Sequence, residues 1–469
     1  MLKTGQLLRR GALATAFTAL AGLSAPGQAI QLEHSLKLKL GGQAEGDPSL
    51  GASDGENTEA YAEVSPSLRL QFTPEFSAYA RAQGFLPSGE ISAEEDERTI
   101  RSKGYIALRE AWVEYGGLTS YPGEVLRLGL QRVRQADGQW LDRDIESLRW
   151  IFDTTLVQAQ LGVARQFSSY RSDDVELSNS QKDRGYGYGD VGGQWTPGHF
   201  LGLRAVYAQD QDPPPEVGSL PEPEDKLAER RYGWLGLRAE SGYYDYQRRD
   251  PLSYWAEFSL LRGDREAAQL APDPGPAPAP GTPAAGTVLT VDQDRRSGRA
   301  IDLGLRAYFG EEFPLVIGAA YAAGSEEYEQ TGLQSNRSRF TGTRSLVHRY
   351  NEAYRAELGN LQVATAFLAV PGERYDASLV YSRFRRDDAN APVVSHGLAV
   401  APSVASRDLG KGVDLVLTRY FEDFGGISSY DDDMRSNLRL RASMFKPGAA
   451  YGEAAEKYYR VMLEATLWF

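Results

Sequence analysis

Arginine recurs at alternate positions of short apolar segments in this sequence. Residues 438–442 read L-R-L-R-A, so Arg439 and Arg441 alternate with apolar neighbours. Successive side chains of an extended strand point to opposite faces, so the arginines share one face and the apolar residues the other. The same alternation predicts a common polar face for Arg69, Arg81, Arg204, Arg238, Arg306, Arg355, Arg439, Arg441 and Arg460.

Two interpretations of these arginines stay open. A polar, water-filled wall needs charged side chains, and each arginine can pair with an acidic residue and have no further role. Alternatively, a set of arginines lowers the electrostatic barrier to a polyanion in a narrow pore, and many weak contacts allow passage. For the set we favour a positive lumen with an anionic cargo, because Ser, Asn and Thr suffice for a wall that only needs to be polar.

Residues suited to catalysis or metal binding are scarce. The chain has no cysteine and only four histidines, His34, His199, His348 and His396, which lack the partners of a Ser-His-acid constellation. The acidic run 431–433 lacks the alternation and the glycine of a calcium loop. We therefore expect no enzyme, no metal site and no cofactor.

The elements that would position the arginines are strands of a membrane barrel. The final ten residues alternate apolar residues with a mixed face that carries Arg460 and Glu464, and they end on Phe469. The mean hydropathy of −0.44 excludes a helical membrane protein, while 49 Gly, 26 Tyr and 7 Trp suit turns and aromatic girdles. The predicted fold class is all-β, a transmembrane antiparallel β-barrel that forms one domain over residues 30–469.

Residues 1–29 have the pattern of a cleaved signal peptide. Lys3, Arg9 and Arg10 precede an apolar run at 11–23, and small residues occupy 27 and 29. The apolar run is shorter than a membrane span requires. Loss of these three bases changes the formal charge from −13 to −16, so a nucleic-acid partner is not expected.

Eighteen segments fit the strand pattern. They are residues 35–41, 61–72, 76–85, 105–115, 125–133, 145–152, 157–167, 185–195, 200–208, 231–240, 252–262, 299–309, 313–322, 346–370, 374–384, 413–421, 436–445 and 460–469. An even number of strands places both termini on the periplasmic side. The count requires 346–370 to be one long strand that passes through Gly359 and Asn360.

The remaining segments sort into long external loops and short periplasmic turns. The external loops are predicted at 87–102, 135–144, 168–184, 209–230, 263–298, 323–345, 385–412 and 446–457, and the one long periplasmic connection at 422–435. Residues 210–225 and 273–286 are rich in proline and are of low complexity. No N-terminal plug, second globular domain or soluble passenger is expected.

Several sequence runs resemble the outer-membrane alginate export porin family, and the similarity covers nearly the whole mature chain. They are Y-I-A-L-R-E-A-W-V-E-Y (105–115), the run at 117–134, Q-W-T-P-G-H-F (194–200), the run at 330–349, Y-D-A-S-L-V-Y (375–381) and F-K-P-G-A-A-Y-G (445–452). The resemblance implies an eighteen-stranded monomeric barrel that exports alginate, a linear polyuronate, through an arginine-rich constriction. It also implies an outer-membrane location, an extracellular gate at 87–102 and a periplasmic gate at 422–435.

The family's constriction would correspond to Lys39, Arg109, Arg132, Arg337, Arg439, Arg441 and Arg460, with acidic partners Asp142, Asp173 and Glu464. Alternation independently supports five of these positions, which are Lys39, Arg439, Arg441, Arg460 and Glu464. Alternation conflicts for Arg132, which would share a face with Leu126, Leu128 and Leu130 unless a bulge intervenes. Leu346 stands where the family has an arginine and Ser169 where it has an acid, which predicts a less charged constriction.

The expected partners follow from the barrel and the resemblance. They are alginate or another polyuronate, outer-membrane lipid, and periplasmic proteins of a polysaccharide secretion complex. A general porin selective for small anions is the alternative, because both functions place arginine in the lumen.

Overall fold

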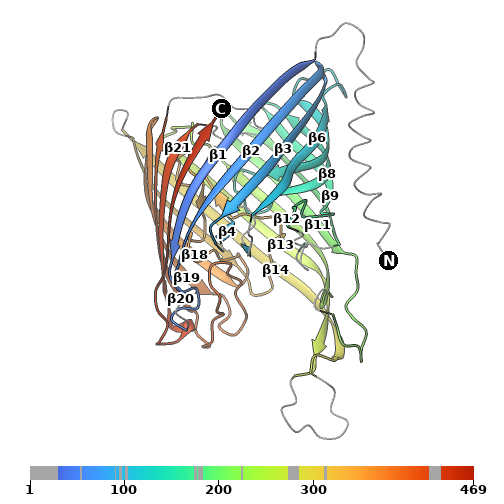
Figure 1. Cartoon of the computed structure of the whole chain (residues 1–469), viewed down its shortest axis with the longest axis vertical. Coiled ribbons are helices and arrows are strands. Elements are labelled where there is room, and N and C mark those ends of the chain that lie inside the picture. Colours follow the sequence, from blue (N-terminus) through green and yellow to red (C-terminus); the bar gives the residue numbers. More distant parts are fainter. Residues whose placement is uncertain are drawn as a thin grey trace, which may run out of the picture.

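The segments in which polar and apolar residues alternate form the strands of one closed barrel in the computed structural model (Figure 1). The structure describes residues 30–52, 55–89, 91–93, 98–100, 104–173, 177, 183–222, 225–272, 285–310, 314–421 and 435–469. The predicted signal peptide and nearly all of the predicted periplasmic gate, residues 422–434, lie outside this range. Among the described residues, no helix is long and apolar enough to cross a membrane.

Eighteen antiparallel strands form the wall, as the sequence predicts. In chain order they are β1 (Gln31–Glu45), β2 (Asn57–Thr73), β3 (Phe76–Pro87), β6 (Tyr105–Tyr115), β7 (Glu124–Arg134), β8 (Asp142–Asp153), β9 (Val157–Arg165), β10 (Arg184–Thr196), β11 (His199–Asp210), β12 (Ala228–Glu240), β13 (Leu252–Leu270), β14 (Val288–Phe309), β15 (Leu315–Gly324), β18 (Leu361–Pro371), β19 (Tyr375–Arg386), β20 (Asp408–Tyr420), β21 (Asn437–Pro447) and β22 (Tyr458–Trp468). β1 pairs with β22 and closes the sheet, and Leu36 N donates to Phe469 O at 3.0 Å.

Smaller elements occupy three of the connections on the rim away from Gln31 and Phe469. Strands β4 (Ile91–Ala93) and β5 (Arg98–Ile100) pair with each other, as do β16 (Arg337–Ser338) and β17 (Val347–His348). The short 3-10 helix η1 (Ala449–Tyr451) precedes β22. Because long connections of outer-membrane barrels face outside, we call this the extracellular rim.

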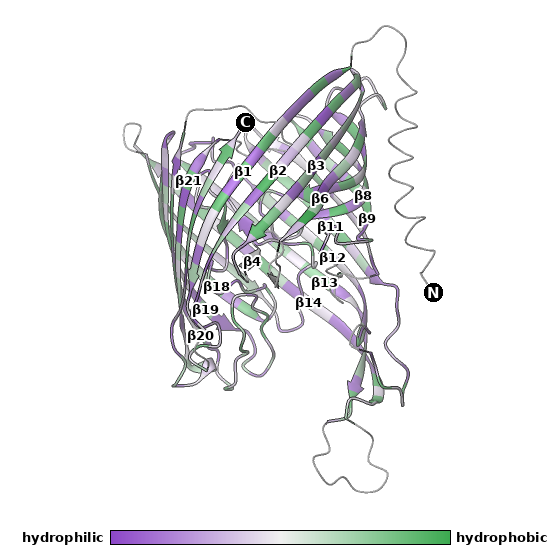
Figure 2. Ribbon diagram, viewed as in Figure 1, coloured by the Kyte–Doolittle hydropathy of each residue, from purple (hydrophilic) through white to green (hydrophobic). Residues whose placement is uncertain are grey.

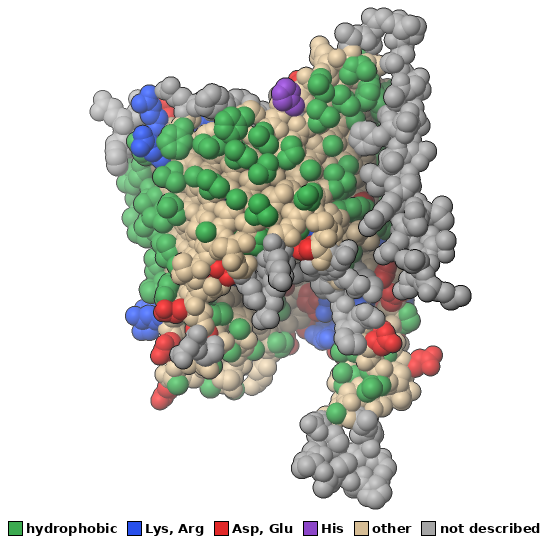
Figure 3. Space-filling model, viewed as in Figure 1, with side chains coloured by type: hydrophobic (Ala, Val, Ile, Leu, Met, Phe, Trp, Pro, Cys, Tyr) green, Lys and Arg blue, Asp and Glu red, His purple; other side chains and the backbone are tan. Residues whose placement is uncertain are grey.

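Side chains divide by parity between two environments. Outward positions such as Leu235 and Leu379 are 54% and 46% exposed on the protein surface, where lipid covers them in a membrane. Figure 2 shows hydrophobic and hydrophilic residues alternating along the strands, and Figure 3 shows hydrophobic side chains gathered on the outer wall of the face in view. Two inward clusters of aromatic and aliphatic residues, one around Tyr354 and one around Phe340, form the interior packing.

The prediction of one long strand at 346–370 is wrong. The wall strand β18 begins at Leu361, and residues 325–360 form a connection that folds into the barrel. Asn351, Arg355 and Asn360 have positive φ values of 67°, 47° and 51°, which an extended strand does not allow. Arg355 is therefore not an inward strand residue. It lies in the connection, where its Nη2 donates to His396 O at 2.9 Å.

The predicted external loop at 263–298 is also largely strand. β13 continues to Leu270 and β14 starts at Val288, so this hairpin projects beyond the rest of the extracellular rim (Figure 1). The two strands stay paired from Leu252↔Ala307 to Leu270↔Val288. Charged residues occupy consecutive positions in the extension, as in Asp264, Arg265 and Glu266, so both of its faces are polar, which fits a hairpin surrounded by water rather than lipid.

A charge in the middle of the outward face tests the placement of the lipid band. We expect Leu379→Arg on β19 to lower the free energy of unfolding in vesicles by about 2–4 kcal/mol, because a guanidinium then faces hydrocarbon. Urea titration of the barrel folded into vesicles measures this. Leu379→Met is the matched control, and equal stability of both variants would contradict the lipid-facing assignment.

Candidate functional site

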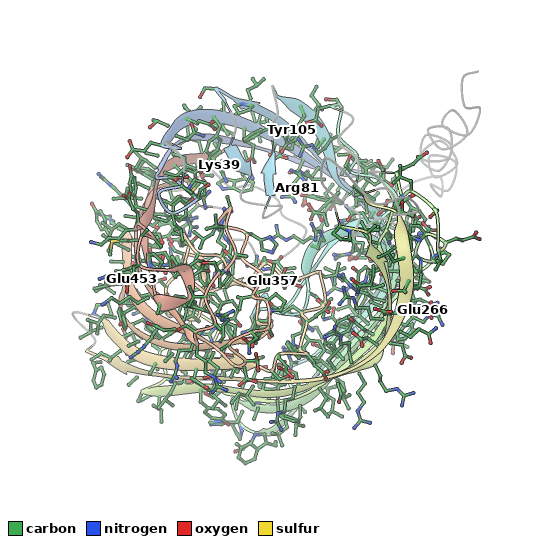
Figure 4. The ribbon with its side chains drawn as sticks, turned by 90° about the horizontal axis from the view of Figure 1, so that it is seen from below. Lys39, Arg81, Tyr105, Glu266, Glu357 and Glu453 are labelled. Atoms are coloured by element: carbon green, nitrogen blue, oxygen red, sulfur yellow. The ribbon has the colours of Figure 1, made fainter. Side chains whose placement is uncertain are left out.

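The connection at 325–360, here called the inner loop, fills much of the lumen. In the end-on view of Figure 4, its Glu357 lies near the centre of the barrel, whereas Lys39 and Arg81 lie on the wall. Tyr350 and Tyr354 are 1% and 0% exposed, and burial raises the pKa of both hydroxyls well above the ordinary value. The inner loop is therefore a packed part of the interior.

Strands β20 and β21 hold the inner loop by its backbone and side chains. Asn351 Nδ2 donates to Asp414 Oδ1 at 2.7 Å and to Ser443 Oγ at 3.0 Å. The backbone N of Glu352 donates to the same Asp414 oxygen at 3.0 Å. A second attachment is an ion pair between Arg349 and Asp302 of β14. These contacts join the inner loop to walls on both sides.

An ion-pair cluster joins β1, β21, β22 and the inner loop. Glu464 Oε1 lies 3.4 Å from Lys39 Nζ and accepts a 2.5 Å hydrogen bond from the Tyr61 hydroxyl. Its other oxygen lies 3.7 Å from Arg441 Nε. Glu464 is 3% exposed, so a single buried acid contacts a cation on each of its two neighbouring strands.

Glu352 of the inner loop extends this cluster. Its two oxygens each lie 2.7 Å from a guanidinium nitrogen, one of Arg337 and one of Arg441. Arg441 also donates to the backbone O of Leu346 at 2.8 Å. Leu346 thus contributes its carbonyl oxygen to the cluster, and its side chain brings no charge.

Two further predicted residues of the last strands also point inward. Arg460 is 2% exposed and donates to Gln43 Oε1 at 2.8 Å, while its Nε lies 3.9 Å from Glu45. Arg439 is half-buried and its Nε lies 3.3 Å from Thr418 Oγ1. Arg460 is thus part of the packed wall, whereas Arg439 stays partly exposed.

Arg109 faces inward from a bulge in β6. The register between β3 and β6 shifts at this residue, its Nε donates to Gln83 Oε1 at 2.5 Å, and Nη2 donates to the Tyr105 hydroxyl at 3.1 Å. The ring of Tyr105 also stacks under Arg171 at 3.7 Å, and Arg171 makes two hydrogen bonds to Asp173. Asp173 therefore holds the Arg171 guanidinium beside the ring of Tyr105.

The hairpin between β7 and β8 leaves the wall and bends into the lumen. β6 pairs with β7 only over residues 111–115, and nearer the extracellular rim its edge pairs with residues 170–172, where Leu108 N donates to Tyr170 O at 3.0 Å. The bent hairpin is covered on both faces, since the consecutive residues Leu130 and Gln131, whose side chains point to opposite faces, are 6% and 0% exposed.

This bend explains the position of Arg132. Its Nε lies 2.7 Å from Asp142 Oδ1, and the other oxygen of Asp142 accepts a 2.6 Å hydrogen bond from Ser335 of the inner loop. The conflict with strict alternation disappears because residues 131–146 are no longer part of the cylindrical wall. Arg134 also lies near Asp142, at 3.8 Å.

The remaining inward arginines are mostly packed against acids, aromatic rings or carbonyl groups. Arg204 is 1% exposed, lies 2.6 Å from Asp137 and 3.3 Å from Glu257, and sits between the rings of Trp140 and Trp255. Arg238 lies 3.5 Å from Asp190, and Arg306 donates to the backbone O of Asp245 at 2.8 Å. For these residues, the structure fits the interpretation in which arginine is part of a solvated or packed wall.

A smaller group of inward cations, here called the lining set, is more exposed than Arg204 and Arg460. The side chains of Lys39, Arg132 and Arg337 are 17%, 18% and 13% exposed. Arg81 on β3, beside Glu110 at 3.2 Å, is 13% exposed, and Arg69 on β2 is half-buried. Together with Arg439, these cations face the interior and keep contact with solvent. Sequence reasoning left Lys37 and Glu352 off its list of pore residues, although Lys37 shares the face of Lys39 and lies 2.6 Å from Glu63.

The described residues hold no group of three or more His, Cys, Asp and Glu that fits a metal ion.

A closed eighteen-stranded wall with a lipid-facing exterior and an interior lined by charged side chains defines an outer-membrane channel of the porin type. Solved structures agree on the fold. OccK8 (OprE) of Pseudomonas aeruginosa has a TM-score of 0.54 at 10% identity, covering 94% of this chain and 98% of that chain. OccAB1 of Acinetobacter baumannii has a TM-score of 0.52 at 10% identity, covering 93% and 97%.

Sequence comparison identifies the particular family. The family model described as alginate export matches residues 31–462. The alginate production protein AlgE of Pseudomonas aeruginosa is 38% identical over 456 residues, which is 90% of this chain and 88% of the relative, and that of Pseudomonas syringae pv. tomato is 36% identical over 478 residues, which is 93% and 94%. The chain belongs to the alginate export family, and it is an outer-membrane channel rather than an enzyme.

The attachment of the inner loop can be tested at Asn351. We expect Asn351→Ala to lower the free energy of unfolding by about 1–3 kcal/mol, because Asp414 and Ser443 lose a buried donor. The freed loop should also raise the mean single-channel current in a planar bilayer. Asn390→Ala, in an exposed connection, is the control. Unchanged stability and current in Asn351→Ala would show that this attachment does not hold the loop.

Proposed function

We propose that this channel carries alginate out of the cell by passive, gated diffusion along the lining set of Lys39, Arg69, Arg81, Arg132, Arg337 and Arg439. The observation that supports this most is their partial exposure. These inward cations keep contact with solvent in a protein with a formal charge of −13, whereas Arg204 and Arg460 are packed away. A linear polyuronate carries one carboxylate per sugar and suits a series of separated cations.

Acidic neighbours would keep each of these contacts weak. Lys39 faces Glu464, Arg132 faces Asp142, and Arg337 faces Glu352. A carboxylate of the polymer would have to compete with a carboxylate of the protein at every step. Conduction needs binding that favours entry and still permits exit, and partly neutralised cations provide that balance. The negative charge of the polymer would thus be accommodated along the path without a tight site.

An extracellular pocket extends the proposed path. It has a volume of about 570 Å³ and is lined by Arg143, Arg184, Arg230, Arg265 and Arg296 together with Glu326, Glu327, Glu329 and Glu357. The arginines offer carboxylate-binding groups at the exit, and the glutamates limit how long a chain is held there. Release at this end is consistent with a polymer that leaves by diffusion.

Two connections are proposed as gates. The extracellular one is 87–102, whose sequence carries Glu94, Glu95, Asp96 and Glu97, and the periplasmic one is 422–435 with its run of three aspartates. Acidic segments repel a polyuronate, so each would oppose passage until displaced. We further propose that the barrel acts as a monomer and receives polymer from periplasmic proteins of a secretion complex.

A general anion porin is the second candidate, and planar-bilayer recording with uronate oligomers separates the two. We expect the purified barrel to prefer anions and its current to be blocked by oligo-uronates, because a long polyanion spans several lining cations at once. Chloride is the control for charge alone. Cation preference, or no block at saturating oligomer, would rule out the export proposal. Anion preference without block would favour the general porin.

Charge removal at the lining set should change selectivity without loss of folding. We expect Lys39→Gln with Arg439→Gln to lower the anion-to-cation permeability ratio by about two- to fivefold, because two partly exposed cations are lost from the path. Reversal potentials in a salt gradient measure the ratio. Arg419→Gln is the control, since Arg419 faces outward near the rings of Tyr375 and Phe421. An equal effect in the control would mean that the lumen does not set selectivity.

The proposed extracellular gate predicts an effect on block. Replacing Glu94, Glu95, Asp96 and Glu97 by Gln or Asn should raise the rate at which oligo-uronates added outside block the current, because four repelling charges are gone. Oligomers added on the periplasmic side are the control. No change in the blocking rate would count against a gating role for this connection.

A further inference from the structure

Three cations face outward from adjacent strands and lie directly opposite one another. β19 pairs Arg383 with Lys411 of β20, and β20 pairs Lys411 with Lys446 of β21. All three side chains are exposed, whereas the sequence neighbours Phe384 and Phe445 are 0% exposed and point inward. We call Arg383, Lys411 and Lys446 the basic row.

The next strand continues this pattern by one residue. Phe445 pairs with Tyr458 of β22, so Lys446 is followed across the sheet by Lys457, which is exposed and directly precedes that strand. Cations thus lie at a similar level on β19, β20 and β21 and directly before β22. The row lies on the outer wall and takes no part in the lumen.

Like charges placed directly opposite one another in a sheet destabilise it. Directly opposite Cβ atoms lie only ~5 Å apart, and no ion pair to an acid within 4.0 Å is found for Arg383, Lys411 or Lys446 among the described residues. Two outward arginines, one on β12 and one on β14, differ. Arg231 lies 2.7 Å from Glu229, and Arg295 lies 3.7 Å from Asp264. The basic row lacks this internal compensation, which suggests an anion from outside the chain.

The level of the row in the membrane indicates where that anion comes from. On β20, the outward positions between Lys411 and Arg419 are Val413, Leu415 and Leu417, all apolar. Eight residues at about 3.3 Å each span roughly 26 Å along the strand, which a tilt of about 40° reduces to about 20 Å along the membrane normal. The long side chains of Lys411 and Arg419 can extend from these positions to the two edges of the apolar band, which is about 25 Å tall in such barrels. Lys411 and Arg419 therefore mark its two borders.

Aromatic residues support the same level. Tyr381 lies two residues from Arg383 on the same face of β19 and is 44% exposed, and Tyr459 lies two residues from Lys457 on β22 and is 39% exposed. Exposed tyrosines in such barrels form girdles at the membrane interface. The basic row is thus at the height of the headgroups of the outer leaflet.

We propose that the basic row binds the phosphate groups of the anionic glycolipid that forms the outer leaflet of this membrane. A phosphate group has several acceptor oxygens and carries up to two negative charges, so one group can contact two opposite cations of the row. The occupant is a lipid rather than exported polymer because the row borders the hydrocarbon band on the outer wall. This site is independent of the proposed path through the lumen.

Binding of bis-phosphorylated lipid A to the full-length barrel in detergent tests the proposal, with native mass spectrometry as the readout. The test variant carries Arg383→Gln, Lys411→Gln and Lys446→Gln. We expect its affinity for lipid A to be roughly tenfold lower than that of wild type, because surface cations attract anionic headgroups additively. The matched control, Arg165→Gln with Arg231→Gln and Arg295→Gln, removes three outward arginines that lie 2.7, 2.7 and 3.7 Å from Asp183, Glu229 and Asp264, and it should bind as wild type does. Wild type should bind dephosphorylated lipid A no more tightly than the test variant does, because without phosphate groups the basic row has nothing to recognise.

Several results would overturn the proposal. These are unchanged affinity in the test variant, an equal loss in the control, equal binding of the dephosphorylated lipid, or displacement of lipid A by oligo-uronate, which would assign the row to polymer. Unaltered single-channel conductance in the test variant shows that the barrel is folded and that the lumen is unaffected. If the triple variant does not fold, Lys411→Gln alone removes the central cation and should give a smaller loss of the same kind.

Discussion

A strand that crosses a membrane must satisfy every backbone N–H and C=O group within the protein, because hydrocarbon offers no hydrogen bonds. The pairing of β1 with β22 meets this demand by leaving the wall no open edge. Once the sheet is closed, each wall strand alternates between lipid and lumen. A chain of mean hydropathy −0.44 can therefore span a membrane, since only every second residue of a strand needs to be apolar.

The lumen shows how a polar interior becomes a packed one. The inner loop enters from the extracellular rim and is held through Asn351, Glu352 and Arg349 to three wall strands. Burying one charge alone is costly, so the buried arginines are matched by acids, as Arg204 is by Asp137. The cations that remain partly exposed form a narrower set, and their meaning for transport depends on their access to solvent as well as on their charge.

The same residue types have different roles on the two faces of the wall. Inside, Lys39 and Arg132 lie beside acids in a shared aqueous path. Outside, Arg383, Lys411 and Lys446 mark the border of the lipid band and lie near no acid that pairs with them among the described residues. Parity decides the face of each cation, and its distance along the strand decides whether it meets hydrocarbon, headgroups or water.

Local alternation in the sequence determined the closed barrel, its eighteen strands and the inward direction of Arg439, Arg441 and Arg460, because a strand in the wall has a strict period of two. It failed at 346–360 and could not place Arg132 or Arg355. Apolar residues mark burial in a packed lumen as well as contact with lipid, so Tyr354 and Leu358 imitate a lipid-facing pattern. Only the tertiary structure decided these positions, because the bend of the β7–β8 hairpin and the course of the inner loop depend on contacts between residues far apart in the chain.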